Sequence, residues 1–143
     1  MSIQSILWRN GSAVATIRAT ETVKCAADRM REHNIAALVV KSGDEITGLI
    51  SEREIVHAVS LHGEDALSML VMDTVSHAAI VVAPGESLKR AMSLMTRHGV
   101  RHLLAMANGK LLGIVSIGDV VKHRLEDLEL ESNVLRDAYI AAH

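Results

Sequence analysis

The strongest constraint on this chain is that one segment of it occurs twice. When the sequence is shifted by 65 positions, residues 16–56 align with residues 81–121 without a gap. Many aligned pairs only exchange one apolar residue for another. The identical pairs are Glu21/Glu86, Lys24/Lys89, Ala26/Ala91, Met30/Met95, His33/His98, Leu38/Leu103, Gly48/Gly113, Ser51/Ser116 and Val56/Val121. A fixed internal period indicates a repeated structural unit, so we expect two copies of one α/β (α+β) unit.

Each copy is predicted to run strand–helix–strand–strand–helix, from apolar periodicity and turn residues. The first copy comprises a strand at 14–17, a helix capped by Thr20 or Thr22 and ending at His33, strands at 37–41 and 46–50, and a helix at 52–61. The second comprises a strand at 80–82, a helix capped by Ser87, strands at 103–106 and 111–115, and a helix from about Ile117 to about Ala141. A leading helix at 3–9 and a connector at 65–75 with a helical turn complete the prediction.

The end of each copy carries a motif whose residue types are able to bind a ligand. Gly113 to Asp119 is a short apolar strand followed by a helix start, with Ser116 at the N-cap position and Asp119 three residues later. A helix start offers unpaired N–H groups and a positive dipole end, which attract phosphate. An ionised Asp one turn into the helix can accept two hydrogen bonds from a ribose diol. The alternative is a plain N-cap on a structural helix.

The last helix carries an apolar stripe longer than one small domain needs. Val121, Leu125, Leu128, Leu135 and Tyr139 follow a four–three spacing that Ser132 interrupts. Acidic residues between them form a solvated face: Glu126, Asp127, Glu129 and Glu131. Such a stripe fits contact with a second subunit. Packing against the chain's own leading helix fits it equally well.

Composition excludes several classes of function. The net charge is −2 with His neutral, which argues against a general binder of nucleic acids or anionic membranes. The only aromatic residues are Trp8 and Tyr139, which leaves little to stack on single-stranded bases. The single cysteine, Cys25, cannot form an internal disulfide and is expected to be exposed. The sequence contains no signal-peptide pattern and no membrane-length apolar run, so we expect a cytoplasmic protein.

The motifs of common enzymes are missing. Gly113 to Gly118 is Gly-x-x-Ser-x-Gly and not the nucleophile elbow of serine hydrolases. The sequence contains no Gly-x-Gly-x-x-Gly and no Walker lysine, and Cys25 has no second thiol. His33 and His98 fall at predicted helix ends, where a cationic ring favours the helix dipole. We therefore expect no catalytic residues, no metal site and no required cofactor.

The duplicated unit that ends in Gly-x-x-Ser-x-x-Asp resembles the cystathionine-β-synthase (CBS) domain pair, also called a Bateman module. The resemblance covers roughly residues 10–125 and is closest to small bacterial CBS-pair proteins. It implies CBS repeats at 10–62 and 79–125, a connector at 63–78 and a helical extension at 126–143. It also implies that the repeats pack through their sheets with pseudo-two-fold symmetry and leave two clefts for adenine nucleotides.

Carried over residue by residue, the resemblance assigns Ser116 to phosphate and Asp119 to the ribose hydroxyls. Ile117 and Val100, with the backbone near Val81 and Val82, would line the adenine pocket, and Arg101 and His102 would face the phosphates. Gly118 is also expected among the ligand-binding residues. A half-buried structural His102 is an equal alternative. By symmetry, Ser51 and Arg53 of the first repeat would approach the same central region, and Glu54 stands at the position that corresponds to Asp119. Glu54 replaces the common Asp, which makes the first cleft the less secure site, and Leu104 replaces a common Pro.

The main hypothesis is an adenosine-ligand sensor that takes AMP or a related compound such as ATP. The alternatives are an NAD(H) or S-adenosylmethionine sensor, and a ligand-free scaffold for dimerisation. In either case we expect a homodimer that acts on a regulated protein which the sequence does not identify.

Overall fold

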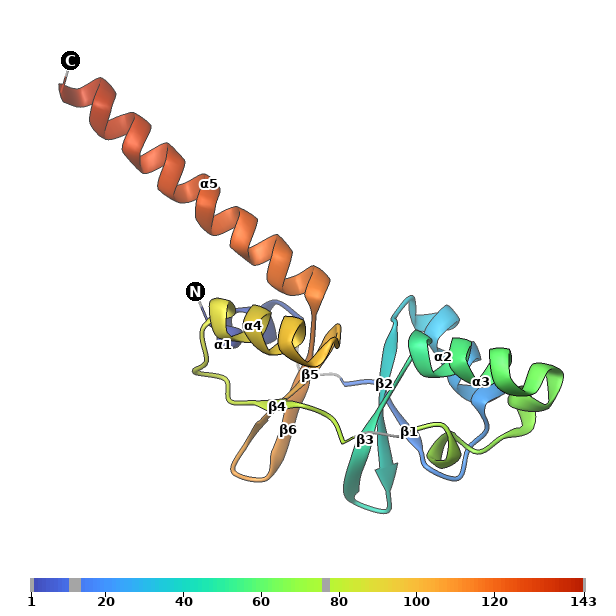
Figure 1. The fold of residues 1–143 in the computed structure, drawn as a ribbon. Helices are drawn as coiled ribbons and strands as arrows, with labels where there is room; N and C mark the ends of the chain where they lie inside the picture. The colour runs from blue at the N-terminus through green and yellow to red at the C-terminus, as the bar shows by residue number, and fades with distance from the viewer. Residues whose placement is uncertain (1, 11–13, 76–77, 143) are drawn as a thin grey trace. The chain divides into compact units, whose positions relative to one another are not determined.

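The computed structural model describes residues 2–10, 14–75 and 78–142, which form two compact units (Figure 1). One unit, here the N-repeat unit, is Val14–Ala79. The other, here the C-repeat unit, combines Met1–Ala13 with Ile80–His143. The N-terminal segment therefore belongs to the unit built by the second half of the chain.

The N-repeat unit is a three-stranded mixed sheet with two α-helices. Its elements are β1 (Thr16–Arg18), α2 (Val23–His33), β2 (Ala37–Ser42), β3 (Glu45–Ser51) and α3 (Glu52–His62), followed by the 3₁₀ helices η1 (Gly63–Ser68) and η2 (Val71–Asp73). The strand order is β1-β2-β3, with β1 parallel and β3 antiparallel to β2. The helical turn predicted in the connector is confirmed as η1 and η2.

The C-repeat unit has the same sheet and a longer final helix. Its elements are α1 (Ile3–Asn10), β4 (Val81–Val82), α4 (Leu88–His98), β5 (His102–Ala107), β6 (Lys110–Ser116) and α5 (Ile117–Ala142). The strand order is β4-β5-β6, again with one parallel and one antiparallel pairing.

The predicted repeat is confirmed element by element, since α4, β5 and β6 each begin and end 65 residues after α2, β2 and β3. The registers repeat as well. Ala37 pairs with Ser51 in one sheet and His102 with Ser116 in the other. Each hairpin also shifts register at the same place, after Val40 and after Ala105. β1 begins at Thr16 rather than at the predicted residue 14.

The first helix of each repeat, α2 or α4, has the same length because the same kinds of capping residue stand at both of its ends. Thr22 accepts a hydrogen bond from the Cys25 N–H at 3.2 Å, and Ser87 accepts one from the Arg90 N–H at 3.1 Å. Left-handed residues follow the last turns, Asn34 with φ 52° and Gly99 with φ 63°. His33 and His98 are the final helical residues, as predicted, and Cys25 is exposed, as expected.

Each unit has a hydrophobic core of its own. In the N-repeat unit α2 and the sheet bury residues that include Ala26, Met30, Leu38 and Ile50. In the C-repeat unit α4, α5 and the sheet bury Leu88, Ala91, Met95, Leu103, Val115 and Val120, together with Ile3, Ile6 and Leu7 of α1.

The segment that precedes each repeat in the sequence packs against the other repeat. In the C-repeat unit the Ile3 N–H donates to Glu86 O at 2.9 Å, and Ile3 is fully buried. In the N-repeat unit the Val71 N–H donates to Glu21 O at 2.8 Å, and Val71 is fully buried. Because Glu21 and Glu86 are repeat equivalents, Ile3 and Val71 fill the same position in the two units.

α5 continues well past the core of the C-repeat unit. Val120 and His123 are its buried residues, and all residues from 128 to 142 are exposed. α1 contacts α5 through an Arg9–Glu126 ion pair of 2.6 Å. The described residues nevertheless leave the predicted stripe uncovered, with exposed fractions from 44% at Val121 to 72% at Leu135. The alternative that the leading helix covers this stripe is therefore wrong.

Candidate functional site

Ser116 and Asp119 form a capping box at the start of α5. The Asp119 N–H donates to Ser116 Oγ at 3.1 Å, and the Ser116 N–H donates to Asp119 Oδ2 at 3.1 Å. This reciprocal pair satisfies a donor of the first helical turn and fixes the carboxylate beside it. The predicted capping role of both residues is confirmed.

A residue of α1 adds a second hydrogen bond to the same carboxylate. Asn10 Nδ2 donates to Asp119 Oδ2 at 3.2 Å. Both hydrogen bonds to the carboxylate end on Oδ2, and no described residue donates one to Oδ1. Asp119 is half-buried, so one oxygen is held by the protein and the other has capacity to accept.

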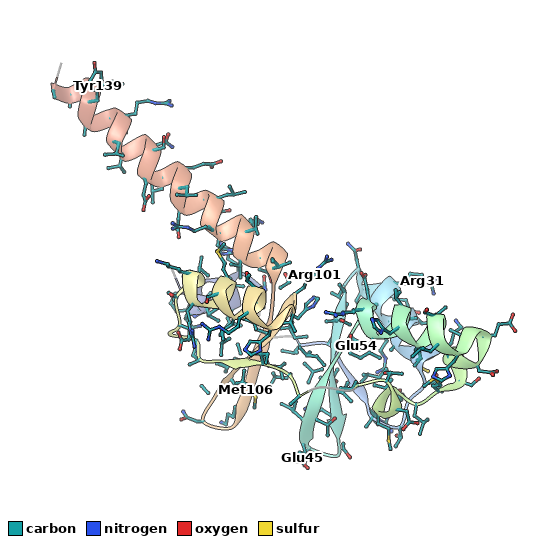
Figure 2. The ribbon with its side chains drawn as sticks, in the orientation of Figure 1. Arg31, Glu45, Glu54, Arg101, Met106 and Tyr139 are labelled. Carbon is teal, nitrogen blue, oxygen red and sulfur yellow. The ribbon has the colours of Figure 1, made fainter. Side chains whose placement is uncertain are left out.

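The start of β5 lies against the start of α5. His102 pairs with Ser116 across the hairpin, and the Ile117 N–H donates to Arg101 O at 2.9 Å. Arg101, labelled in Figure 2, is exposed, and His102 is half-buried. The structure thus brings a cation, an imidazole and the capping Ser together at one end of the sheet.

The predicted apolar residues divide between surface and core. Ile117 is 41% exposed and Val81 is 53% exposed, whereas Val82 is buried in the core of the unit. Val100 is half-buried and packs against that core. Gly118 is exposed, and a Cβ atom there would meet only Ser116 Oγ, at 3.7 Å. The helix start therefore presents open backbone at Gly118 beside apolar Ile117.

Leu104 makes a backbone contact that the common Pro could not make. Its N–H donates to Ile80 O at 2.9 Å and ties β5 to the segment before β4. Val39 makes the equivalent bond to Ala15 O at 3.0 Å in the N-repeat unit.

The N-repeat unit contains the equivalent helix start with a longer carboxylate. The Ser51 N–H donates to Glu54 Oε2 at 2.7 Å, and the Ser51 hydroxyl donates to the same oxygen. Glu54, labelled in Figure 2, completes a capping box at the start of α3. Arg53 is exposed on the first turn of that helix.

His123 is a buried polar residue that sequence reasoning missed. Its Nδ1 lies 2.9 Å from Asp119 O, and its side chain is almost fully buried. Nε2 has no hydrogen-bond partner among the described residues. The signal in the sequence is its position three residues after Val120, on the buried side of the helix.

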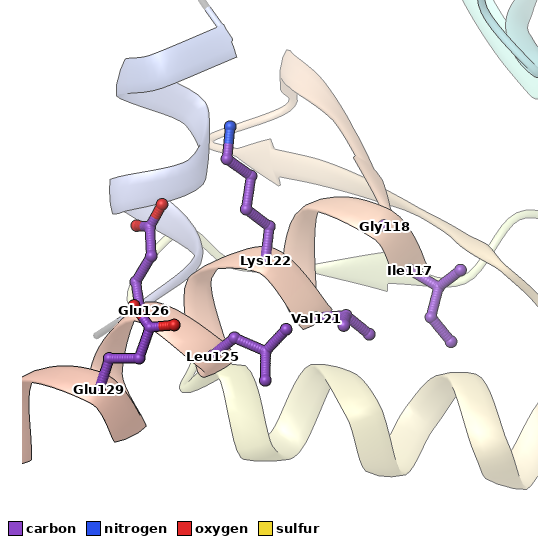
Figure 3. A pocket seen from close by; sticks show the side chains of 7 residues that line it. All are labelled: Ile117, Gly118, Val121, Lys122, Leu125, Glu126 and Glu129. Atoms are coloured by element: carbon purple, nitrogen blue, oxygen red, sulfur yellow. The ribbon is translucent and has the colours of Figure 1, made fainter. Parts of the chain in front are cut away.

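A shallow groove runs along the first turns of α5 (Figure 3). In the close-up, Val121 and Leu125 lie on the side of α5 that faces α4, while Lys122 and Glu126 lie toward α1. The lining residues are Ile117, Gly118, Val121, Lys122, Leu125, Glu126 and Glu129. Only Ile117 and Gly118 belong both to this groove and to the predicted ligand site.

The described residues show neither a metal-binding cluster nor a membrane-spanning helix. They contain no group of three His, Cys, Asp or Glu side chains arranged to hold a metal ion. His98 and His102 stand four residues apart but do not share a helix, since α4 ends at His98 and β5 begins at His102. None of the helices described could cross a bilayer.

The matched family model and the similar known proteins point to one family. The family model described as CBS domain matches residues 11–61 and 71–126. The mitochondrial CBS domain-containing protein CBSX3 of Arabidopsis thaliana is 37% identical over 107 residues, which are 71% of this chain and 52% of that protein. The chain thus spans about half the length of this relative.

Two solved structures have the same fold over most of their length. A CBS-domain protein from Agrobacterium tumefaciens gives a TM-score of 0.83 at 32% identity, covering 86% of this chain and 92% of that one. A CBS-domain protein from Burkholderia ambifaria, assigned to signal transduction, gives 0.83 at 33% identity, covering 89% and 96%. With the duplicated sheet and the matched family model, these likenesses show that the chain belongs to the CBS domain family as a tandem CBS pair.

Proposed function

We propose that this CBS pair is a regulatory module that binds an adenosine compound, AMP in the first place, at the start of α5. The observation that carries the proposal is the capping box of Ser116 and Asp119, whose remaining hydrogen-bonding capacity matches a ribose phosphate. ATP, NAD(H) and S-adenosylmethionine share the adenosine part and are the related candidates.

Capping and ligand binding are compatible in this arrangement. Ser116 Oγ accepts from the Asp119 N–H, which leaves its own hydroxyl proton to donate to a phosphate oxygen. Asp119 Oδ1 accepts no hydrogen bond from a described residue, so it is available to a ribose hydroxyl. The ligand would therefore add contacts to the helix start without breaking the existing ones.

The surroundings supply the other parts of an adenosine phosphate site. Exposed Arg101 offers a cation for phosphate, and the exposed Gly118 backbone allows close approach to the helix N-terminus. Ile117, Val81 and Val100 offer aliphatic surface for the base, with His102 beside the phosphate position. This suits a chain whose aromatic residues number only two.

The helix start of the N-repeat unit is proposed as a second, weaker position. Ser51, Arg53 and Glu54 repeat the pattern, but a single oxygen of Glu54 accepts from both the N–H and the hydroxyl of Ser51. Because the Ser51 proton is already donated, less capacity remains for a phosphate there than at Ser116.

Signalling is proposed to pass from the bound ligand to a second protein. We infer no catalytic step and no required cofactor, since the sequence lacks the motifs of common enzymes and nucleotide cofactors. The module would form a homodimer, and the ligand would shift its equilibrium between two conformations that a regulated protein distinguishes. Nucleic acids and membranes are not among the proposed partners, and a cytoplasmic location is proposed.

A thermal-shift screen tests the ligand class. AMP, ATP, NADH and S-adenosylmethionine are added separately to the full chain, with inosine monophosphate as the base-changed control. A ligand at 100 times its Kd stabilises the folded state by about 2.7 kcal/mol, which such a screen detects. We expect AMP to stabilise more than the inosine compound does. No stabilisation by any adenosine compound would refute the sensor and favour the scaffold.

The scaffold is the second candidate because one observation favours it. The apolar stripe on α5 is exposed and needs no small ligand to act as a contact surface. Under this reading the duplicated fold would serve only to hold α5 in place.

A further inference from the structure

α5 is longer than its own unit can stabilise. Residues 128–142 are exposed on every side, although a helical segment of this length is marginal in water unless one face is packed. Leu128, Leu135 and Tyr139 are 44%, 72% and 64% exposed. Figure 2 places Tyr139 near the far end of α5, away from α1 and α4. The helix therefore presents an apolar face that lacks a cover from the described parts of its unit.

The spacing of that face is the heptad spacing of a two-stranded coiled coil. Val121, Leu128, Leu135 and Ala142 recur every seven residues and take the d positions. Leu125, Ser132 and Tyr139 recur in the same way and take the a positions. The groove at the start of α5, lined by Val121 and Leu125, is continuous with this face (Figure 3).

The charged residues beside the stripe favour a second copy of this chain as the partner, with its α5 parallel to the first. In a parallel, in-register pair each g residue faces the e residue of the next heptad on the other helix. Arg124 then faces Glu129 of the second copy, and Glu131 faces Arg136 of the second copy. Symmetry repeats both attractive pairs. All four side chains are exposed and so available.

The reverse direction is disfavoured by the same charges. When two α5 helices run antiparallel about the centre of the stripe, e residues face e residues and g residues face g residues. Glu129 then meets Glu129, Glu131 meets Glu131, and Lys122 meets Arg136 of the second copy. Like charges across a helix pair are destabilising. Ser132 at a central a position also favours the parallel, in-register alignment, since the two Ser132 hydroxyls pair best when they are directly opposed.

We propose that α5 joins two copies of this chain as a parallel, in-register coiled coil over residues 121–142. The proposal does not depend on the ligand. It gives the homodimer a defined contact surface. It also places the C-terminal ends of the two α5 helices side by side, at the position farthest from the sheets.

Site-specific disulfide formation tests the alignment directly. In a Cys25→Ser background, Ser132→Cys places one thiol at the a position and Leu130→Cys places one on the outer face as a matched control. Under mild oxidation of the full chain we expect a covalent dimer from Ser132→Cys and at least tenfold less from Leu130→Cys. Equal yields at both positions, or none at residue 132, would overturn the proposal.

Charge exchange supplies a second test with the same protein. Arg124→Glu and Glu129→Arg should each weaken the dimer by about tenfold in sedimentation equilibrium, because each converts two attractive pairs into repulsive ones. The double variant should recover the original affinity, since the pair is restored with its signs exchanged. If the double variant dimerises no more tightly than either single variant, the parallel arrangement is refuted. AMP stabilisation should be unchanged in all three, so this test stands apart from the test of the ligand site.

Discussion

At the scale of a single residue, the two carboxylate oxygens of Asp119 differ in their contacts. Oδ2 receives Ser116 and Asn10, which hold the carboxylate against the helix start, and Oδ1 accepts from no described residue. At the equivalent position, Glu54 uses Oε2 for both groups of Ser51. One methylene group thus changes whether the hydroxyl of the N-cap Ser donates to the capping carboxylate, as in Ser51, or accepts from the backbone N–H, as in Ser116.

His123 provides a prediction about a buried polar atom. Replacement by Leu keeps most of the volume and removes an Nε2 that has no described partner, at the loss of the contact to Asp119 O. We expect His123→Leu to leave the free energy of unfolding unchanged or raise it by about 1 kcal/mol. Val120→Ala, one turn earlier and fully buried, should lower it by about 2 kcal/mol in the same urea titration. A loss above 2 kcal/mol for His123→Leu would show that Nε2 is satisfied.

A second residue-scale prediction concerns the Arg29–Glu21 pair. Arg29 binds both carboxylate oxygens of Glu21, at 2.7 and 2.9 Å, and the Arg18 N–H donates to one of them at 2.9 Å. The backbone hydrogen bond from Arg18, followed by the contacts with Arg29, lowers the pKa of Glu21 below 4.5. A lowered folded-state pKa contributes stability that is present above the unfolded pKa and lost as the pH falls through the folded value.

Arg29→Met should therefore destabilise the protein by about 1 kcal/mol at pH 7, a modest value because the pair is partly exposed. The difference from the natural protein should shrink as the pH is lowered from 5 toward 3. Urea titrations across that range measure it, with exposed Arg97→Met as the control. A difference that does not change with pH would contradict the electrostatic origin.

Residue-level prediction from sequence succeeded where the cause is local. Thr22, Ser87 and Ser116 were recognisable as N-caps because capping depends on residues three positions away. Asn10 and His123 were not recognisable as neighbours of Asp119. Asn10 reaches it from α1, 109 positions earlier in the chain, and nothing local records that contact.

The main finding at the scale of elements is that the segment preceding each repeat completes the core of the other repeat. α1 completes the core of the C-repeat unit, and η2 occupies the same place in the N-repeat unit. The duplication did not reveal this, since Ile3 and Val71 are offset by 68 positions whereas the rest of the repeat is offset by 65. The strands and helices of the repeat were predictable because apolar periodicity and turn residues set them locally.

Gly113 tests how α1 is seated. A Cβ atom at this position of β6 would lie 2.8 Å from Leu7 Cδ2, so one of the two must move. We expect Gly113→Ala to lower the free energy of unfolding by about 1–2 kcal/mol through overpacking. Gly85→Ala is the matched control, because a Cβ there meets nothing within 4 Å. Equal stability of both variants in thermal denaturation would mean that Leu7 is loosely held.

At the scale of the whole molecule, the chain is two units with separate cores, each closed by a segment from outside its repeat. Ile6→Ala should raise amide hydrogen exchange in β4, β5 and β6, because Ile6 is fully buried in that core. Val71→Ala should do so in β1, β2 and β3. Trp8→Ala, 76% exposed, is the control. Increased exchange in β1–β3 alone on Ile6→Ala would contradict the assignment of α1.

The central claim is that an adenosine compound binds beside Asp119, and isothermal titration calorimetry with AMP tests it most directly. We predict that Asp119→Ala weakens AMP by about 30- to 1000-fold, the loss of one or two charge-assisted hydrogen bonds worth about 2–4 kcal/mol. Glu54→Ala, the equivalent change in the N-repeat unit, should have the smaller effect. AMP affinity that persists unchanged in Asp119→Ala, in a protein shown to be folded, would contradict the account.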